Sequence, residues 1–128
     1  MKKLSRRQFI AITGASIITG SVKGEPLVAA KKQLIHTTYF WLKTQTPWLI
    51  AGLQTLRQVP AIKDLHIGLP AITEKRDVVD NSFQVSELMV FDDLAGQSEY
   101  QAHPIHQAFV KNCSHLWSKV AVKDSITV

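Results

Sequence analysis

Alternating apolar and polar positions predict several β-strands in this chain, and stretches with apolar residues at helical spacing lie between them. The first alternating stretch, from Gln33 to Leu42, is rich in the β-branched and aromatic residues that favour strands. Apolar residues then recur at helical spacing between Pro47 and Pro60. Further strands are predicted over 62–69, 83–91 and 120–126, with a polar loop over 73–81.

A second helical region separates the last two strands. Asp92 or Asp93 can cap a helix that runs through Tyr100, Pro104 interrupts it, and a further helical segment continues to Leu116. The resulting order, β-α-β-β-α-β, is the ferredoxin-like arrangement, in which an antiparallel sheet carries its helices on one face. We therefore predict an α+β fold.

Strand one has two different faces, because successive side chains of a strand point to opposite sides. One face carries Leu34, His36, Thr38 and Phe40. The other carries Ile35, Thr37, Tyr39 and Trp41. The second face is too apolar to lie against water, and such a surface usually marks an interface between chains. We therefore predict a homodimer in which two sheets pair face to face and form a barrel.

The first 30 residues have the three-part layout of a secretory signal. A basic start is followed by SRRQFI, then by the weakly apolar run IAITGASIITG, and the small residues VAA at 28–30 fit cleavage after Ala30. The pair Arg6-Arg7 before an apolar pair matches the twin-arginine signal. We predict a signal peptide over 1–30 and a mature domain over 31–128, exported to the periplasm by the twin-arginine translocon. An uncleaved signal would instead tether the domain to the membrane.

The net charge of +5 is carried mainly by this leader. Five of the 15 basic residues and one of the ten acidic residues lie before residue 31, which leaves ten basic and nine acidic residues in the mature domain. A nearly neutral domain lacks the basic surface that binds a polyanion, so we expect no nucleic-acid partner. The single cysteine, Cys113, excludes an internal disulfide.

One motif resembles a known family. The string YQAHPIH over 100–106 is followed by Phe109, by WSK over 117–119 and by Asp124. Together with LIH at 34–36, VPAI at 59–62 and RDVVD at 76–80, it resembles the signature of the stress-responsive dimeric α/β-barrel (Dabb) family. The resemblance covers about residues 33–126 and implies the dimeric barrel, although it does not imply a single activity.

The resemblance also implies roles for three polar residues. Family members include a plant polyketide cyclase, olivetolic acid cyclase, in which a tyrosine and a histidine bracket the HPxH string and perform aldol chemistry. These two residues match Tyr100 and His106, and a pocket histidine of the cyclase matches His36. The resemblance therefore implies that Tyr100 and His106 are catalytic.

The residue types suit that chemistry. An aldol condensation needs a base that removes a proton beside one carbonyl and a donor that holds the oxyanion at the other. Histidine suits the first task and tyrosine the second. Tyr100 and His106 are six positions apart, and the helix break at Pro104 allows both to reach one cavity.

Five residues are expected to line the cleft and bind a ligand: His36, Thr38, Phe40, Glu87 and His103. Glu87 stands in the middle of strand three between apolar neighbours. Strands one and three are adjacent in the ferredoxin-like order, so Glu87 could approach His36 and raise its pKa, or act as a base itself. A carboxylate that meets water or a lysine at the sheet edge is the alternative.

Structural roles remain open for the polar residues. Tyr100 can hydrogen-bond a backbone group, His103 can cap the broken helix, and His106 can be a core histidine. A metal is disfavoured because no carboxylate or thiolate motif accompanies His103 and His106, and no cofactor is expected.

The sequence therefore leaves two functions open. In the first, an exported homodimer holds a small apolar or aromatic ligand in its cleft without turnover. In the second, the cleft is that of an acid-base enzyme, with polyketide-cyclase-like aldol or isomerase chemistry carried by Tyr100 and His106.

Overall fold

The computed structural model describes residues 31–128, and the signal peptide predicted over 1–30 lies outside this range. The elements follow one another as β1 (Leu34–Leu42), α2 (Thr46–Thr55), β2 (Asp64–Gly68), β3 (Val85–Phe91), α3 (Leu94–Ala102), α4 (Pro104–Cys113) and β4 (Trp117–Ile126). Short 3₁₀ turns, Leu56–Gln58 and Ser114–Leu116, follow α2 and α4. The predicted α+β, ferredoxin-like order is confirmed. Within residues 31–128, no helix is long and apolar enough to span a bilayer.

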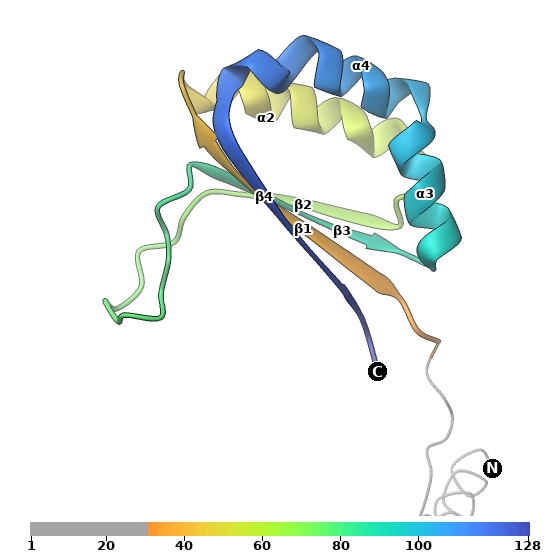
Figure 1. Ribbon diagram of the computed structural model, residues 1–128, viewed down its shortest axis with the longest axis horizontal. Coiled ribbons are helices and arrows are strands. Elements are labelled where there is room, and N and C mark those ends of the chain that lie inside the picture. The colour runs from red at the N-terminus through yellow and green to blue at the C-terminus, as the bar shows by residue number, and fades with distance from the viewer. Residues whose placement is uncertain (1–30) are drawn as a thin grey trace, which may run out of the picture. The chain divides into compact units, whose positions relative to one another are not determined.

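A single antiparallel sheet organises the domain, with the strand order β2-β3-β1-β4. β1 is therefore central and pairs with β3 on one side and β4 on the other. Thr38 lies opposite Glu87 of β3, and His36 lies opposite Asp124 of β4. Helices α2, α3 and α4 all lie on the same face of this sheet (Figure 1).

The core lies between the sheet and these helices. Alternate residues of β1 and β3 point into it, so Phe40, Met89 and Phe91 are almost completely buried. Leu49 and Leu53 of α2 pack onto them from above and have no exposed surface. Each such leucine contributes about 1.5–3 kcal/mol through burial.

The break between α3 and α4 follows from local chemistry. The Asp93 carboxylate caps α3 by accepting a hydrogen bond from the Gly96 amide at 2.8 Å. Of the two caps predicted from the sequence, Asp92 and Asp93, the structure uses Asp93. His103 has an extended backbone, with ψ of 138°, and Pro104 occupies the first turn of α4. Proline has no amide hydrogen, but an amide in the first turn of a helix has no partner within the helix, so nothing is lost there. The extended His103 therefore ends α3, and Pro104 begins α4.

The structure corrects the predicted element ends. β4 begins at Trp117 rather than at residue 120, and Leu116 lies in a 3₁₀ turn instead of a helix. The Trp117 ring packs at 5.1 Å from the ring of Phe40 and at 6.0 Å from that of Phe109, which holds the start of β4 against the core. β2 is shorter by three residues and β3 by two than their predicted ranges, 62–69 and 83–91.

The second face of the sheet has no covering layer within the described residues, as the bare side of the sheet in Figure 1 shows. Tyr39 and Trp41 of β1 lie there half-exposed. The Tyr39 ring packs at 5.0 Å from the Phe83 ring, and the Lys119 ammonium lies 4.4 Å from the centre of a Trp41 ring. This open face is therefore apolar, with a few charged residues at its edge.

Candidate active site

A cavity of about 180 Å³ lies between the sheet and helices α3 and α4. Its polar lining comes from four elements, β1, β3, α3 and α4, and consists of His36, Thr38, Glu87, Tyr100, Gln101 and His106. Its apolar lining consists of Phe40, Phe109, Val110, Trp117, Val120 and Val122. The structure thus brings together six of the seven site residues named from the sequence.

β1 supplies one wall of the cavity. Because side chains alternate along a strand, His36, Thr38 and Phe40 all point toward the helices, and each is at most 5% exposed. A histidine and a threonine in such a place need polar partners, since a buried polar group without a hydrogen bond costs free energy. The partners come from the two neighbouring strands.

Glu87 of β3 is the first partner. The hydroxyl of Thr38, directly across from it, donates a hydrogen bond to Glu87 Oε2 at 3.1 Å. The Glu87 side chain is only 3% exposed. Burial disfavours the charged carboxylate and raises the pKa of Glu87 to about 7, although the Thr38 hydrogen bond opposes the shift. Glu87 is therefore a carboxyl group that exchanges its proton near neutral pH.

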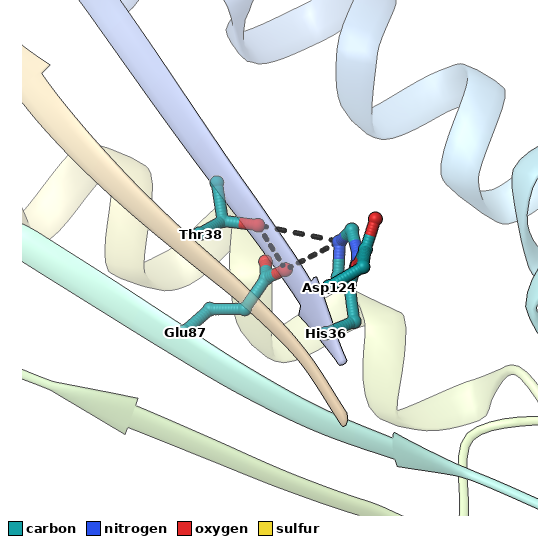
Figure 2. A network of polar contacts seen from close by, with 4 residues as sticks. All are labelled: His36, Thr38, Glu87 and Asp124. Carbon is teal, nitrogen blue, oxygen red and sulfur yellow. Dashed lines mark hydrogen bonds and ion pairs between the residues drawn. The ribbon is translucent and has the colours of Figure 1, made fainter. Parts of the chain in front are cut away.

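His36 lies between two carboxyl groups (Figure 2). Its Nδ1 lies 2.6 Å from Asp124 Oδ1, and its Nε2 lies 3.6 Å from Glu87 Oε2. The Thr38 hydroxyl lies 3.3 Å from Nε2. Because a carboxylate oxygen can only accept, the short contact to Asp124 places a proton on Nδ1, while Nε2 faces Thr38 and Glu87. The prediction that Glu87 approaches His36 agrees with this geometry.

Tyr100 and His106 form the opposite wall. The helix break at Pro104 brings the two rings to a centroid distance of 4.4 Å, and the Tyr100 ring lies 6.1 Å from that of His36. Tyr100 is 2% exposed, and burial together with the nearby Glu87 charge raises the pKa of its hydroxyl. Burial also lowers the pKa of His106 below 6.5, more than its backbone contact to Gln101 raises it. At neutral pH, Tyr100 is thus a proton donor and His106 an uncharged ring.

His103 does not line the cavity. Its Nδ1 accepts a hydrogen bond from the Ile105 amide at 3.1 Å, and this contact caps α4. The expectation that His103 binds ligand is therefore corrected in favour of the capping alternative, because its ring nitrogen satisfies an otherwise unpaired amide of the helix start. Residues 31–128 contain no group of three or more His, Cys, Asp and Glu side chains that could hold a metal ion.

Comparison with known proteins identifies the fold family. The model of the stress responsive A/B barrel domain, Dabb, matches residues 34–127. The chain belongs to the Dabb family. No curated protein matches its sequence.

Solved structures of similar fold include three that bear on this Dabb domain. A Dabb family protein from Mesorhizobium loti is 23% identical, with 76% of this chain and 98% of that chain aligned at a TM-score of 0.62. Hydroxynitrile lyase from Passiflora edulis is 19% identical, with coverages of 77% and 96% and a TM-score of 0.65. A dimeric ferredoxin-like protein of unknown function from Thermobifida fusca is 19% identical, with coverages of 81% and 99% and a TM-score of 0.60. At these identities the likeness shows a shared fold.

One site residue of this Dabb domain was missed from the sequence. Asp124 was noted only as part of the family motif, yet it makes the shortest polar contact of the site, with His36. The signal that could have found it is the pairing of β1 with β4, in which His36 and Asp124 are direct partners. That pairing depends on where β4 begins, and the sequence-based prediction placed this start three residues too late.

Replacing Glu87 by glutamine should make the stability of the Dabb domain less dependent on pH. The carboxyl has an ordinary pKa of 4.5 when unfolded and about 7 when folded, so the folded protein binds the proton more tightly. Wild type therefore loses stability as the pH rises from 4.5 to 7, by about 3 kcal/mol for this group, whereas Glu87→Gln cannot titrate. Urea unfolding of both proteins at pH 5 and pH 8, at one protein concentration, measures the difference. An equal loss in both proteins would contradict the assignment.

Proposed function

We propose that this Dabb domain is an exported homodimer whose cavity binds a small carbonyl compound and performs acid-base chemistry on it through Tyr100 and His106. The observation that carries the proposal is that a buried tyrosine hydroxyl and an uncharged histidine ring line one small cavity. A pocket with convergent polar groups of shifted pKa is the usual form of an acid-base site.

Tyr100 is suited to hold a developing oxyanion. Its hydroxyl stays protonated because burial and the Glu87 charge both raise its pKa. Among residues 31–128, no side chain or backbone group accepts a hydrogen bond from it. A substrate carbonyl oxygen could therefore take this hydrogen bond, which strengthens as the oxygen gains charge.

His106 is suited to act as the base. Its Nδ1 lies 3.1 Å from the Gln101 carbonyl oxygen, which can only accept, so Nδ1 carries the proton and donates. Nε2 of the neutral ring is then free to take a proton from a substrate carbon. Because burial lowers the His106 pKa, this neutral form predominates at pH 7.

The size of the cavity limits the substrate. The cavity volume of about 180 Å³ lies below the roughly 300–1,000 Å³ that is usual for small-molecule pockets. A compound of few non-hydrogen atoms fits this space. Phe40, Phe109 and Trp117 supply an aromatic wall against which an apolar or planar part of the substrate can pack.

The aromatic wall also favours the second candidate function, a cleft that holds a small aromatic ligand without turnover. Binding alone needs the aromatic wall but neither the free Tyr100 hydroxyl nor the neutral His106. One structure of this fold is named a hydroxynitrile lyase, so the fold is compatible with an enzyme that acts on a small molecule. The buried polar groups lead us to favour the enzyme.

The homodimer is proposed from the open face of the sheet. Tyr39, Trp41 and Leu88 lie on it half-exposed, and a water-facing sheet surface of this composition favours association. The similar protein from Thermobifida fusca is described as dimeric. A second copy packed on this face would leave the cavity unobstructed, because the cavity lies on the helical side.

Export is proposed from the leader over residues 1–30. The twin-arginine pair and the small residues before residue 31 support it. The twin-arginine route carries folded proteins, so the domain would fold and dimerise in the cytoplasm before it crosses to the periplasm.

Catalysis of hydrogen exchange tests the acid-base function. We expect the mature domain to speed deuterium uptake at the α-carbons of acetone and acetophenone in D2O, followed by NMR. Tyr100→Phe and His106→Ala should each reduce this rate about 10²-fold or to the rate in buffer, since each removes a group that acts on the proton or the oxyanion. Glu99→Gln, at an exposed position beside Tyr100, is the control. If a compound shifts the NMR signals of the histidine rings but its deuterium uptake is not accelerated, the result would support the binding function instead.

Oligomeric state tests the interface. Leu88→Arg should convert the dimer to a monomer and halve the mass measured by sedimentation, because an arginine on each copy buries unpaired charge at the interface. Leu94→Arg, at an exposed position on α3, should leave the mass unchanged. A wild-type monomer would remove this part of the proposal.

Cell fractionation tests export. In a bacterium with the twin-arginine system, the full chain should reach the periplasm and lose its leader. Arg6→Lys together with Arg7→Lys should hold the unprocessed chain in the cytoplasm. Export of the double variant at the wild-type level would contradict the proposed route.

A further inference from the structure

Glu87 has one carboxylate oxygen that the protein leaves without a partner. Its Oε2 accepts the Thr38 hydrogen bond and faces His36 Nε2. Within residues 31–128, no donor lies within hydrogen-bonding distance of Oε1. The residue is 3% exposed and lines the cavity, so Oε1 can find a partner only in what the cavity contains. A buried polar atom of this kind is costly unless a ligand or water satisfies it.

A chain of polar contacts connects this buried carboxyl to solvent. From Glu87 it passes to the Thr38 hydroxyl at 3.1 Å, then to His36 Nε2 at 3.3 Å, and from His36 Nδ1 to Asp124 at 2.6 Å. Figure 2 shows the four side chains grouped across three neighbouring strands. The Asp124 side chain is 48% exposed, whereas those of His36 and Glu87 are nearly closed to water. Protons can therefore reach Glu87 from solvent without passing through the cavity.

We propose that Glu87 is a further catalytic residue, the general acid that gives a proton to a second oxygen of the substrate, and that the substrate is accordingly a compound with two oxygen functions, a dicarbonyl or its β-hydroxycarbonyl product. This inference rests on the function proposed for Tyr100 and His106. It extends that function from proton removal to the making or breaking of a carbon–carbon bond.

The proposed reaction balances in protons and electrons. His106 Nε2 takes a proton from the carbon beside the first carbonyl, and the Tyr100 hydroxyl holds the enolate oxygen. The enolate carbon then forms a bond to the carbon of the second carbonyl, whose π electrons move to its oxygen. That oxygen takes the proton from Glu87 Oε1. His106 releases its proton to water, and Glu87 regains one through the contact chain, so no oxidant or reductant is consumed.

The charges around Glu87 agree with an acid at this place. The ionisable groups that line the cavity with it are His36 of β1, Tyr100 of α3 and His106 of α4, and Asp124 of β4 lies on the far side of His36. Among residues 31–128, no lysine or arginine lines the cavity to hold Glu87 as an anion. Burial raises the pKa of Glu87 to about 7 and lowers that of His106. A protonated carboxyl and a neutral imidazole can thus coexist near pH 6.5, as acid and base.

Two reactions separate the role of Glu87 from that of Tyr100 and His106. Hydrogen exchange in acetone needs only the base and the oxyanion donor. Cleavage of 4-hydroxy-4-methylpentan-2-one into two acetone molecules is the reverse of the carbon–carbon step, and it also needs Glu87 to take the hydroxyl proton. Glu87→Gln should lower the cleavage rate about 10²-fold or more, and this loss should exceed any loss of acetone exchange in the same variant by about tenfold or more. Glu87→Asp should restore part of the cleavage, and Glu99→Gln should change neither rate.

The pH profile of the cleavage rate is a second measurement, and a purely structural role of Glu87 would not affect it. The rate of cleavage by wild type should rise with pH through about pH 7, because Glu87 must be ionised to take the hydroxyl proton, whereas acetone exchange, which does not use Glu87, should lack this rise. A wild type without exchange would refute the proposed function itself. Exchange without cleavage in the wild type, or an equal loss of both reactions in Glu87→Gln, would overturn the role of Glu87 and leave the proposed function standing.

Discussion

The burial of a polar row on the core side of β1 is the constraint on which the site depends. His36 and Thr38 point into the space between sheet and helices. Burying an apolar residue there would cost less free energy, so each of the two needs a hydrogen-bond partner. The neighbouring strands supply Asp124 and Glu87 at the paired positions. Because polar side chains occupy these positions, apolar side chains do not fill the space between β1 and helices α3 and α4. A cavity with a polar floor remains there.

The helix break at Pro104 completes the enclosure. A continuous helix would separate Tyr100 and His106 by more than one and a half turns, on different faces. The extended residue His103 redirects the chain, and its own ring caps the new helix. Tyr100 is then buried against Phe91, with ring centroids 5.4 Å apart, while His106 stays half-exposed over it. The two residues therefore differ in solvent access, which suits a fixed oxyanion donor beside a base that exchanges protons with water.

The sequence predicted the features that depend on local periodicity. Alternation along β1 placed His36, Thr38 and Phe40 on one face, and the adjacency of strands one and three brought Glu87 to them. What it could not supply depends on long-range register and on side-chain direction. Asp124 reaches His36 only because β4 starts at Trp117 and pairs without a shift from Phe40 to Leu34. His103 lies within the motif, yet its ring turns back to the Ile105 amide, and no spacing rule indicates that direction.

β1 ties the proposed assembly to the site. Its even-numbered residues face the cavity, and its odd-numbered residues, from Ile35 to Trp41, face the open side of the sheet. A slip of β1 by one residue against its neighbours would bury Tyr39 and Trp41 among the helices and expose His36 and Thr38, so one register determines both surfaces. A second copy on the open face would stiffen this strand and hold the register. The dimer and the chemistry would then be coupled through the backbone of β1, because the cavity lies on the opposite, helical side of the sheet.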